Sequence, residues 1–253
     1  MTSMMQKYYD DILEHGEKHL PRGLETVGLT NQCFAFVPGQ VFTRPAGNIN
    51  IGFVELLQFI AGTFDIAPFR VVAPNARLDL FTHQSAYGPR VAEQLPRVIE
   101  ELIGDIDSRR GVMMIAHPTD TPSTLPCTLS AQFQVENVNG LKSLISTWTM
   151  RSSDLVWGLG TDIIQFGGIS MMIANCIGVH AAECIVNAGN AHVYTATRLK
   201  PGEQFNFAGT FALPDLYTLD TYKAWANAAL KFISEEKLMV KSIFPITKDG
   251  EHE

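Results

Sequence analysis

Residues 128–150 read TLSAQFQVENVNGLKSLISTWTM, and this stretch decides the fold class. Apolar residues occupy the odd positions from 129 to 135, and polar residues occupy positions 130, 132 and 134. This alternation is typical of a β-strand with one buried face. The Asn139-Gly140 dipeptide favours a tight hairpin turn, and Leu141–Met150 follows as a second strand. The stretch therefore predicts two strands around a turn inside a β-sheet.

Helical and strand patterns alternate along the rest of the chain, with no internal repeat and no linker. This order predicts a single α+β domain over residues 1–253, in which a mixed β-sheet packs against helices. We expect helices at 4–18, 48–61 (ending at Gly62), 98–103, 162–182 and 219–236, strands at 31–37, 111–117 and 190–194, and a loop-rich segment at 74–90.

Composition excludes several classes of protein. The chain has 253 residues, 46% of them hydrophobic, and a net charge of −7 with no basic block, which argues against a nucleic-acid binder. The four cysteines form neither a CxxC pair nor a zinc-ligand spacing, so we expect no metal site.

The cysteine usage and the N-terminus favour a cytoplasmic protein. Four cysteines in a chain of this length do not suggest a disulfide scaffold, which fits a reducing compartment. The first residues, MTSMMQKYYDD, contain no apolar signal core. The most apolar stretch, 163–179, is shorter than the ~20 residues of a membrane span, so we expect no membrane contact.

Glu55 lies inside an otherwise apolar helical segment, NINIGFVELLQFIA, at residues 48–61. Burying a carboxylate costs several kcal/mol unless it is paired or protonated. One interpretation is a general acid/base with a raised pKa. The other is a helix residue that faces a groove or pairs with an arginine.

A second polar cluster, MRSSDLVWGLGTD, occupies residues 150–162 between a strand and an apolar helix. Its glycines at 158 and 160 allow the backbone to approach a ligand closely. Arg151 could hold an anion or be a lone surface charge. Asp162 could contact a ligand or simply cap the helix that follows.

Two further segments carry weaker signals. In DSRRG, at 107–111, Arg109 and Arg110 could clamp a phosphate, because a guanidinium fork matches phosphate oxygens, or could be solvated. In GNAHVY, at 189–194, His192 and Tyr194 share one face of a strand, which packing alone could explain.

Taken together, these segments resemble the thymidylate synthase family. The segment around Cys127, LPC…QF, is similar to the family's nucleophile segment, and DSRR to its phosphate turn. RSSDLVWGLGTD resembles the signature RSxDxxLGxPFN, and GNAHVY resembles the strand GDxHxY. VELLQFIAG and AYG resemble the HELLWFLxG helix and the VYG motif. The likeness extends from about Tyr8 to Tyr194, and the part from about 198 onward diverges.

Departures from the synthase pattern point to one branch of the family. Where synthases have PFN, this chain has Gly160, Thr161 and Asp162, and Thr128 replaces the histidine after the nucleophile. Asp162 and the PCT sequence are similar to the deoxycytidylate (dCMP) and cytidylate hydroxymethylase branch. The last residues, SIFPITKDGEHE, lack the apolar end that closes over folate in synthases.

The aspartate at position 162 changes the base that the pocket would accept. Cytosine presents N3 as an acceptor and an N4 amino group as a donor. A protonated aspartic acid donates to N3 and accepts from N4, and an ionised one does the same if N3 is protonated. Ionised Asp162 would instead face the O4 lone pairs of uracil, a mismatch that costs ~1–3 kcal/mol.

The resemblance implies a pyrimidine C5-hydroxymethyltransferase that uses 5,10-methylenetetrahydrofolate and water to convert dCMP to 5-hydroxymethyl-dCMP. Cys127 would add to C6 of the base, its thiolate favoured by Arg151. Glu55 would move protons, Tyr87 would assist removal of the C5 proton, and Asp162 would read the base.

The resemblance also implies a ligand set and a homodimer that forms through the sheet. Arg109 and Arg110 would reach the phosphate held by the neighbouring subunit. The substrate-binding set is Arg22, Arg109, Arg110, Gln132, Arg151, Ser152, Asp162, His192 and Tyr194, and the folate-binding set is Glu55, Asp154, Trp157 and Gly158.

Three alternatives stay open from the sequence. Ribose and deoxyribose differ by one hydroxyl, so the protein could be a CMP hydroxymethylase of nucleoside-antibiotic synthesis, although Arg109 and Ser152 favour the deoxy substrate. It could methylate or hydroxymethylate dUMP. It could also be a non-catalytic nucleotide-binding homologue that kept the fold.

Overall fold

The computed structural model describes residues 2–45, 47–75 and 86–248. Its strands form one large mixed sheet and one small sheet. The large sheet has the order β1-β2-β8-β6-β5-β4, and β7 also pairs with β8. The strands are β1 (Glu17–His19), β2 (Thr26–Phe36), β3 (Gln40–Thr43), β4 (Val112–Met114), β5 (Thr128–Val138), β6 (Leu141–Met150), β7 (Ser153–Asp154), β8 (His180–Tyr194) and β9 (Asn206–Thr210).

Most neighbouring strands are antiparallel, but β8 runs parallel to both β6 and β7. The parallel pairing requires a crossover, and the long helix α5 supplies it between β7 and β8. β3 and β9 pair separately as a two-stranded sheet. This topology confirms the expected α+β class with a mixed sheet.

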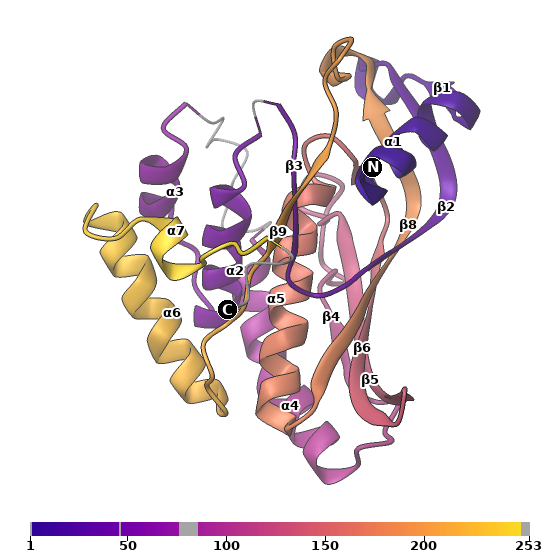
Figure 1. The fold of residues 1–253 in the computed structure, drawn as a ribbon. Coiled ribbons are helices and arrows are strands. Elements are labelled where there is room, and N and C mark those ends of the chain that lie inside the picture. The colour runs from indigo at the N-terminus through magenta and orange to yellow at the C-terminus, as the bar shows by residue number, and fades with distance from the viewer. Residues whose placement is uncertain (1, 46, 76–85, 249–253) are drawn as a thin grey trace.

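The helices cover one face of the large sheet in successive layers. Figure 1 shows α5 against the sheet, α2 beyond it, and α6 with α3 on the far side, while α1 covers the β2 end. The helices are α1 (Met4–His15), α2 (Asn50–Ala61), α3 (Ala67–Val72), α4 (Tyr87–Gly104), α5 (Leu159–Ile177), α6 (Leu219–Ser234) and α7 (Val240–Ile243).

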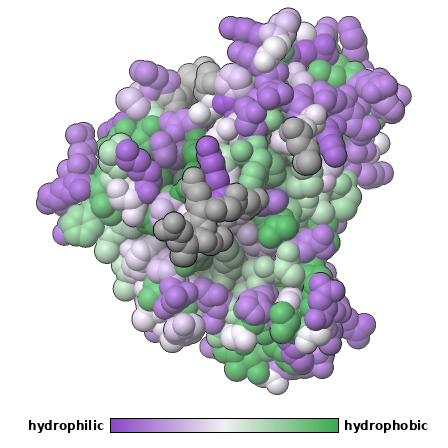
Figure 2. Space-filling model, viewed as in Figure 1, coloured by the Kyte–Doolittle hydropathy of each residue, from purple (hydrophilic) through white to green (hydrophobic). Residues whose placement is uncertain are grey.

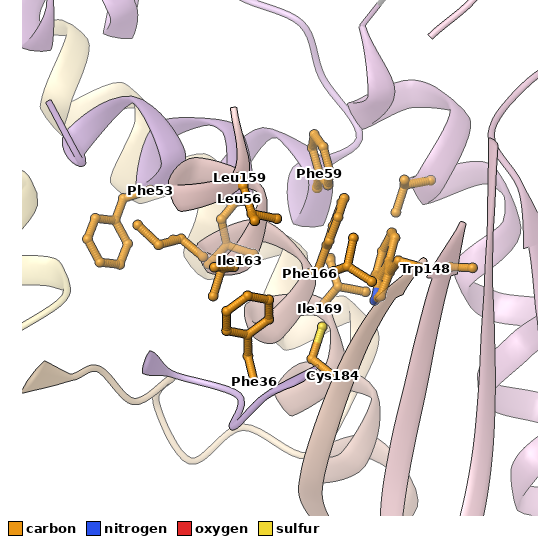
Figure 3. Packing of buried hydrophobic residues seen from close by; sticks show 14 of the residues in the cluster. Phe36, Phe53, Leu56, Phe59, Trp148, Leu159, Ile163, Phe166, Ile169 and Cys184 are labelled. Atoms are coloured by element: carbon orange, nitrogen blue, oxygen red, sulfur yellow. The ribbon is translucent and has the colours of Figure 1, made fainter. Parts of the chain in front are cut away.

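The core lies between the sheet and α2 and α5. Trp148 of β6 stacks on Phe166 of α5, with ring centroids 4.0 Å apart, and Phe133 of β5 meets the same tryptophan edge-on. Figure 3 shows this stack beside Cys184 of β8. Because α2 and α5 are apolar on nearly all sides, as the sequence predicts for α2, both are buried among other elements.

The central hairpin follows the predicted pattern with one local exception. Ala131, Phe133 and Val135 are buried, and Asn139 and Gly140 take the positive φ angles of a tight turn. Leu129 was expected on the buried face but is half-exposed. A register shift between Thr128 and Ser130 explains this, because a β-bulge changes which residues face the core.

Two predicted boundaries around α5 are wrong. The helix covers 159–177 and not 162–182, because Gly178 adopts a left-handed conformation (φ 75°) and ends it. Residues 180–182 instead begin β8, a strand of 15 residues where only 190–194 was expected. Pairing with β2 and β6 along its length stabilises this longer strand.

Elsewhere the elements differ from expectation in length or number. β2 begins five residues before the expected 31, the strand predicted at 111–117 covers only 112–114, and the helix at 98–103 extends back to Tyr87. Part of the segment predicted as loop-rich, 76–85, lies outside the described residues. The sequence patterns predicted neither α3, α7 nor the β3-β9 sheet, and each of these elements has six residues or fewer.

The viewed face of the molecule is mixed in polarity. Figure 2 shows hydrophilic residues gathered at the upper right, over α1 and β1, whose three residues are all exposed. No helix that the structure describes is both long and apolar enough to cross a membrane. Likewise, within the described ranges no group of three or more His, Cys, Asp or Glu side chains is arranged to hold a metal ion.

Candidate active site

Cys127 lies at the entrance to β5, directly before its first residue. The backbone amides of Cys127 and Thr128 both donate to the hydroxyl oxygen of Tyr87, at 3.0 and 3.2 Å. Tyr87 is the first residue of α4, so the start of a helix and the start of a strand meet at the thiol. Burial raises the pKa of Tyr87, and the neighbouring Cys127 raises it further.

Arg151, from the end of β6, fixes the residues before the thiol. Its Nε donates to the Pro126 carbonyl at 3.0 Å, and its Nη2 donates to the Leu125 carbonyl at 3.2 Å. Burial raises the pKa of the Cys127 thiol, and the Arg151 charge opposes that rise. Arg151 thus favours the thiolate, as expected, but burial outweighs it.

A cavity of about 990 Å³ opens beside Cys127. All four residues predicted as catalytic line it: Cys127, Glu55, Tyr87 and Asp162. The remaining wall is largely apolar and aromatic. It includes Phe42, Ile49, Ile51, Phe59, Phe64, Phe69, Trp157 and Phe205.

Two buried carboxyl groups share this cavity. Burial and the nearby Asp162 raise the pKa of Glu55 to about 8. Burial and Asp154 raise the pKa of Asp162 to about 7. Both groups therefore hold protons in a pH range where exposed carboxyls are ionised.

Asp162 lies in the first turn of α5 but does not cap it. The position before the helix is Gly158, and no side chain forms a cap hydrogen bond there. The interpretation of Asp162 as a helix cap is therefore wrong. Its carboxyl lies close to the Gly158 backbone, since a Cβ at Gly158 would be 3.5 Å from Oδ2.

Asp154 organises the turn that leads into α5. Its Oδ1 accepts the backbone amides of Val156 at 2.8 Å and Trp157 at 3.2 Å. Burial raises the pKa of Asp154, and these two hydrogen bonds oppose the rise. Trp157 and Gly158 line the large cavity, whereas Asp154 lies behind them as a support.

Two residues of the cavity wall carry no motif and no predicted role, Gln165 and Arg44. Gln165 donates from Nε2 to Oε2 of Glu55 at 2.5 Å. The signal that identified Glu55, a polar residue inside an apolar helix, was equally present at Gln165. Arg44 stacks over the Trp157 ring, 4.0 Å from its centroid, and only tertiary structure reveals this pair.

A second cavity, of about 570 Å³, lies on the other side of Arg151. Five residues predicted to bind substrate line it: Arg22, Arg151, Ser152, His192 and Tyr194. Asn190, which has no predicted role, lines it too.

Two features shape the wall of this second cavity: the contact between Ser152 and His192, and the backbone conformation of Arg22. Nδ1 of His192 lies 3.4 Å from Oγ of Ser152, and burial lowers the pKa of His192, which favours the neutral ring. Arg22 takes a left-handed backbone conformation, with φ 51°, beside Gly23. Such backbone strain is common at ligand sites.

Three predicted substrate contacts lie away from both cavities. Arg110 donates to Glu101 at 2.8 Å, and Gln132 donates to the Arg109 carbonyl at 3.3 Å. None of the three lines either cavity described above. Arg109 and Arg110 could contact a nucleotide only in a second subunit. The contact predicted for Gln132 stays a prediction.

Comparison with known proteins identifies the family. The family model described as thymidylate synthase matches residues 78–225, which include Tyr87, Cys127, Arg151, Asp162 and His192. Glu55 lies before that range. The chain is 31% identical to human thymidylate synthase over 113 residues, covering 44% of this chain and 35% of the human protein.

Bacterial relatives match over a longer stretch. Thymidylate synthases of Bacillus subtilis subsp. natto and Bacillus atrophaeus are 28% identical over 153 residues, or 56% of this chain. The alignments cover 53% and 65% of those two proteins, so the chain matches less than two thirds of each relative's length. The family match over more than half of this chain places it in the thymidylate synthase family.

Proposed function

We propose that this protein is a folate-dependent one-carbon transferase that hydroxymethylates C5 of dCMP. In this reaction dCMP, 5,10-methylenetetrahydrofolate and water give 5-hydroxymethyl-dCMP and tetrahydrofolate. The proposal rests on two findings. The chain belongs to the thymidylate synthase family, and it carries a buried acid, Asp162, in the cavity next to Cys127.

An acid at position 162, in the cavity beside Cys127, is the observation that supports a cytosine substrate. With a pKa raised to about 7, this carboxyl is protonated in a large fraction of molecules at neutral pH. A carboxylic acid donates one hydrogen bond and accepts another, which matches N3 and N4 of cytosine. Uracil presents a donor at N3 and an acceptor at O4. The ionised fraction of Asp162 would face the O4 lone pairs, whereas it would accept both hydrogen bonds from N3-protonated cytosine.

The large cavity has a volume and an aromatic lining that would suit a folate. Its volume of about 990 Å³ exceeds what a pyrimidine ring needs, and its aromatic wall suits flat rings. Ile49, Ile51 and Trp157 would contact them, with Asp154 supporting the turn beneath Trp157. When bound, the folate supplies a one-carbon unit at the oxidation level of formaldehyde.

The residues of this chain would divide the reaction between them. The Cys127 thiol loses its proton and its sulfur bonds to C6, which makes C5 nucleophilic. Arg151 lowers the cost of the thiolate. Glu55 exchanges protons with the base, a task that suits a buried carboxyl with a pKa of about 8. Tyr87 holds the backbone at Cys127 and would assist loss of the C5 proton.

The second cavity would hold the sugar and phosphate. Arg22, Arg151 and Ser152 offer donors to phosphate oxygens, and His192 with Tyr194 would contact the 3′-hydroxyl. Arg151 of this cavity hydrogen-bonds to Pro126, which lines the large cavity beside Cys127, so the two cavities are neighbours. We further propose a homodimer through the sheet, in which Arg109 and Arg110 of each subunit complete the phosphate site of the other.

The alternative that deserves a direct test is methylation of dUMP. The relatives in both human and Bacillus carry the name thymidylate synthase, which favours this reaction. Methylation oxidises the folate to dihydrofolate, whereas hydroxymethylation releases tetrahydrofolate. The two reactions therefore differ in both products.

Mass spectrometry of products from dCMP, CMP, dUMP and UMP, each with methylenetetrahydrofolate, tests the proposal. We expect 5-hydroxymethyl-dCMP as the main product and no dihydrofolate absorbance. Cys127→Ser is the matched inactive control. Thymidylate formation from dUMP, or no product from any nucleotide, would overturn the proposal.

A further inference from the structure

The side chain of Gln165 reaches from α5 to the carboxyl of Glu55 on α2. Its Nε2 lies 2.5 Å from Oε2 of Glu55, and its side chain is almost fully buried, with 2% of its surface exposed. Both residues line the large cavity. Gln165 also lies three positions after Asp162, so the two share one face of α5.

Two glycines bring the helices close enough for this contact. A Cβ at Gly52 of α2 would lie 3.2 Å from the Cα and carbonyl oxygen of Thr161. A Cβ at Gly168 of α5 would lie 2.4 Å from the Leu56 side chain. Figure 3 shows Leu56 among Leu159 and Ile163 at this crossing. The glycines lie three positions before Glu55 and three after Gln165, so they bracket the pair.

Gln165 is the hydrogen-bond partner of Glu55 within the described chain. Among the residues that the structure describes, Asp162 is the charged group that acts on Glu55 and disfavours its ionisation, and no described lysine or arginine opposes it. Tyr87 of α4 and Cys127 at β5 face the same cavity. The hydrogen bond that the Gln165 amide donates to the Glu55 carboxyl is of the kind that favours the ionised form.

We infer that Gln165 is a positioning residue for Glu55: its amide holds one carboxyl oxygen and leaves the other directed to the cavity. The N–H donor serves both ionisation states without turning, since it can donate to a carboxylate oxygen or, more weakly, to the carbonyl oxygen of a carboxylic acid. Gln165 can thus keep Glu55 in place while a proton moves. The inference rests on the proposed function for the role of that proton.

Ionisation of Glu55 provides the direct test, without any substrate. In protein with ¹³C-labelled glutamate, NMR follows the Glu55 carboxyl through a pH titration, and Glu55→Gln identifies its signal. Gln165→Met keeps the side-chain volume and removes the donor. We expect the titration midpoint of Glu55 to rise by about one pH unit, because a hydrogen bond to a charged group is worth more than one to a neutral group.

Ser170→Ala is the matched control on the same helix. Ser170 is buried and donates to Ser146 or to the Phe166 carbonyl, both at 2.7 Å, away from the cavity. Its loss should lower the melting temperature and leave the Glu55 midpoint in place. An unchanged or lower midpoint in Gln165→Met would overturn the inference.

Turnover separates this inference from the proposed function. In Gln165→Met we expect kcat to fall about tenfold and its acidic limb to move to higher pH, with KM for dCMP within about twofold of wild type. If wild-type protein converts no nucleotide, the proposed function fails while the NMR titration still decides the pairing. If wild type is active and Gln165→Met retains its kcat and pH profile, the positioning role fails alone.

Discussion

The hydroxyl oxygen of Tyr87 lies 3.0 Å from the backbone nitrogen of Cys127, and the amide of Thr128 donates to the same oxygen at 3.2 Å. Tyr87→Phe removes the acceptor of two amides at once. We expect a loss of about 1–3 kcal/mol in the free energy of unfolding, measured in urea, because those amides become unpaired. We also expect kcat for dCMP to fall at least tenfold as the thiol loses its fixed position.

Tyr8→Phe is the control for that variant. The Tyr8 hydroxyl also accepts a backbone amide, that of Ala35 at 3.3 Å, but it lies on α1 away from the cavities. We expect it to lower stability and to leave kcat unchanged. Equal losses of activity in both variants would show that Tyr87 acts through stability alone.

Asp162→Asn should reverse the preference for the base. Ionised Asp162 only accepts hydrogen bonds, so it suits N3-protonated cytosine and repels O4 of uracil, whereas an amide supplies an acceptor for N3–H and a donor for O4. We expect the ratio of kcat/KM for dCMP to that for dUMP to fall by about 10- to 100-fold. Competition between the two nucleotides in one reaction measures this ratio, and an unchanged ratio contradicts the role of Asp162.

Stability should decrease as pH rises from about 5 to 8. Glu55 and Asp162 have pKa values raised to about 8 and about 7, so over this range the folded state binds more protons than the unfolded state. An excess of bound protons in the folded state makes the free energy of unfolding fall with pH, by up to about 1.4 kcal/mol per pH unit for each group. The stabilisation is complete near pH 4 and is lost by about pH 8.

Urea unfolding at a series of pH values in wild type and Glu55→Gln checks this dependence. An amide at position 55 does not titrate, so the slope between pH 5 and 8 should become shallower. A slope that is equally steep in both proteins would show that Glu55 ionises at its ordinary pKa. The double variant with Asp162→Asn should be flatter still.

The Cys127 thiol should react slowly with iodoacetamide at neutral pH and faster as pH rises, because burial raises its pKa. Removing the Arg151 charge in Arg151→Gln should raise that pKa further and slow alkylation at pH 8 about threefold to tenfold. Peptide mass spectrometry resolves each cysteine, and exposed Cys33 gives the reference rate. Faster alkylation of Cys127 in the variant would contradict the electrostatic role of Arg151.

Local patterns were sufficient for much of the fold. The alternation at 129–135, the Asn139-Gly140 turn and the apolar run of α5 each predict an element that the structure contains. Short elements such as α3 and β9 depend on tertiary contacts, and six residues or fewer carry too little periodicity to predict. The end of α5 was misplaced because residues 179–182 are apolar enough to continue a helix, although Gly178 ends it.

The candidate site was predictable to the extent that single residues broke an apolar pattern or matched a motif. Glu55 did both, and Asp162 was singled out as a departure from the PFN motif of the synthases; the two residues line the same cavity. Gln165 broke the same pattern but had no motif to draw attention to it. The stacking of Arg44 on Trp157 joins segments more than a hundred positions apart, so no local pattern could indicate it.

The glycine-bracketed crossing of α2 and α5 also limits how this protein can move. With Gly52 against the Thr161 backbone and Gly168 against Leu56, the two helices are so closely packed that they leave no space to move toward each other. Any tightening around a ligand must then come from the rim, where Arg44 and Trp157 meet, and the floor that carries the two acids stays fixed. Crystals grown with and without nucleotide should therefore superpose on these helices and diverge at the rim.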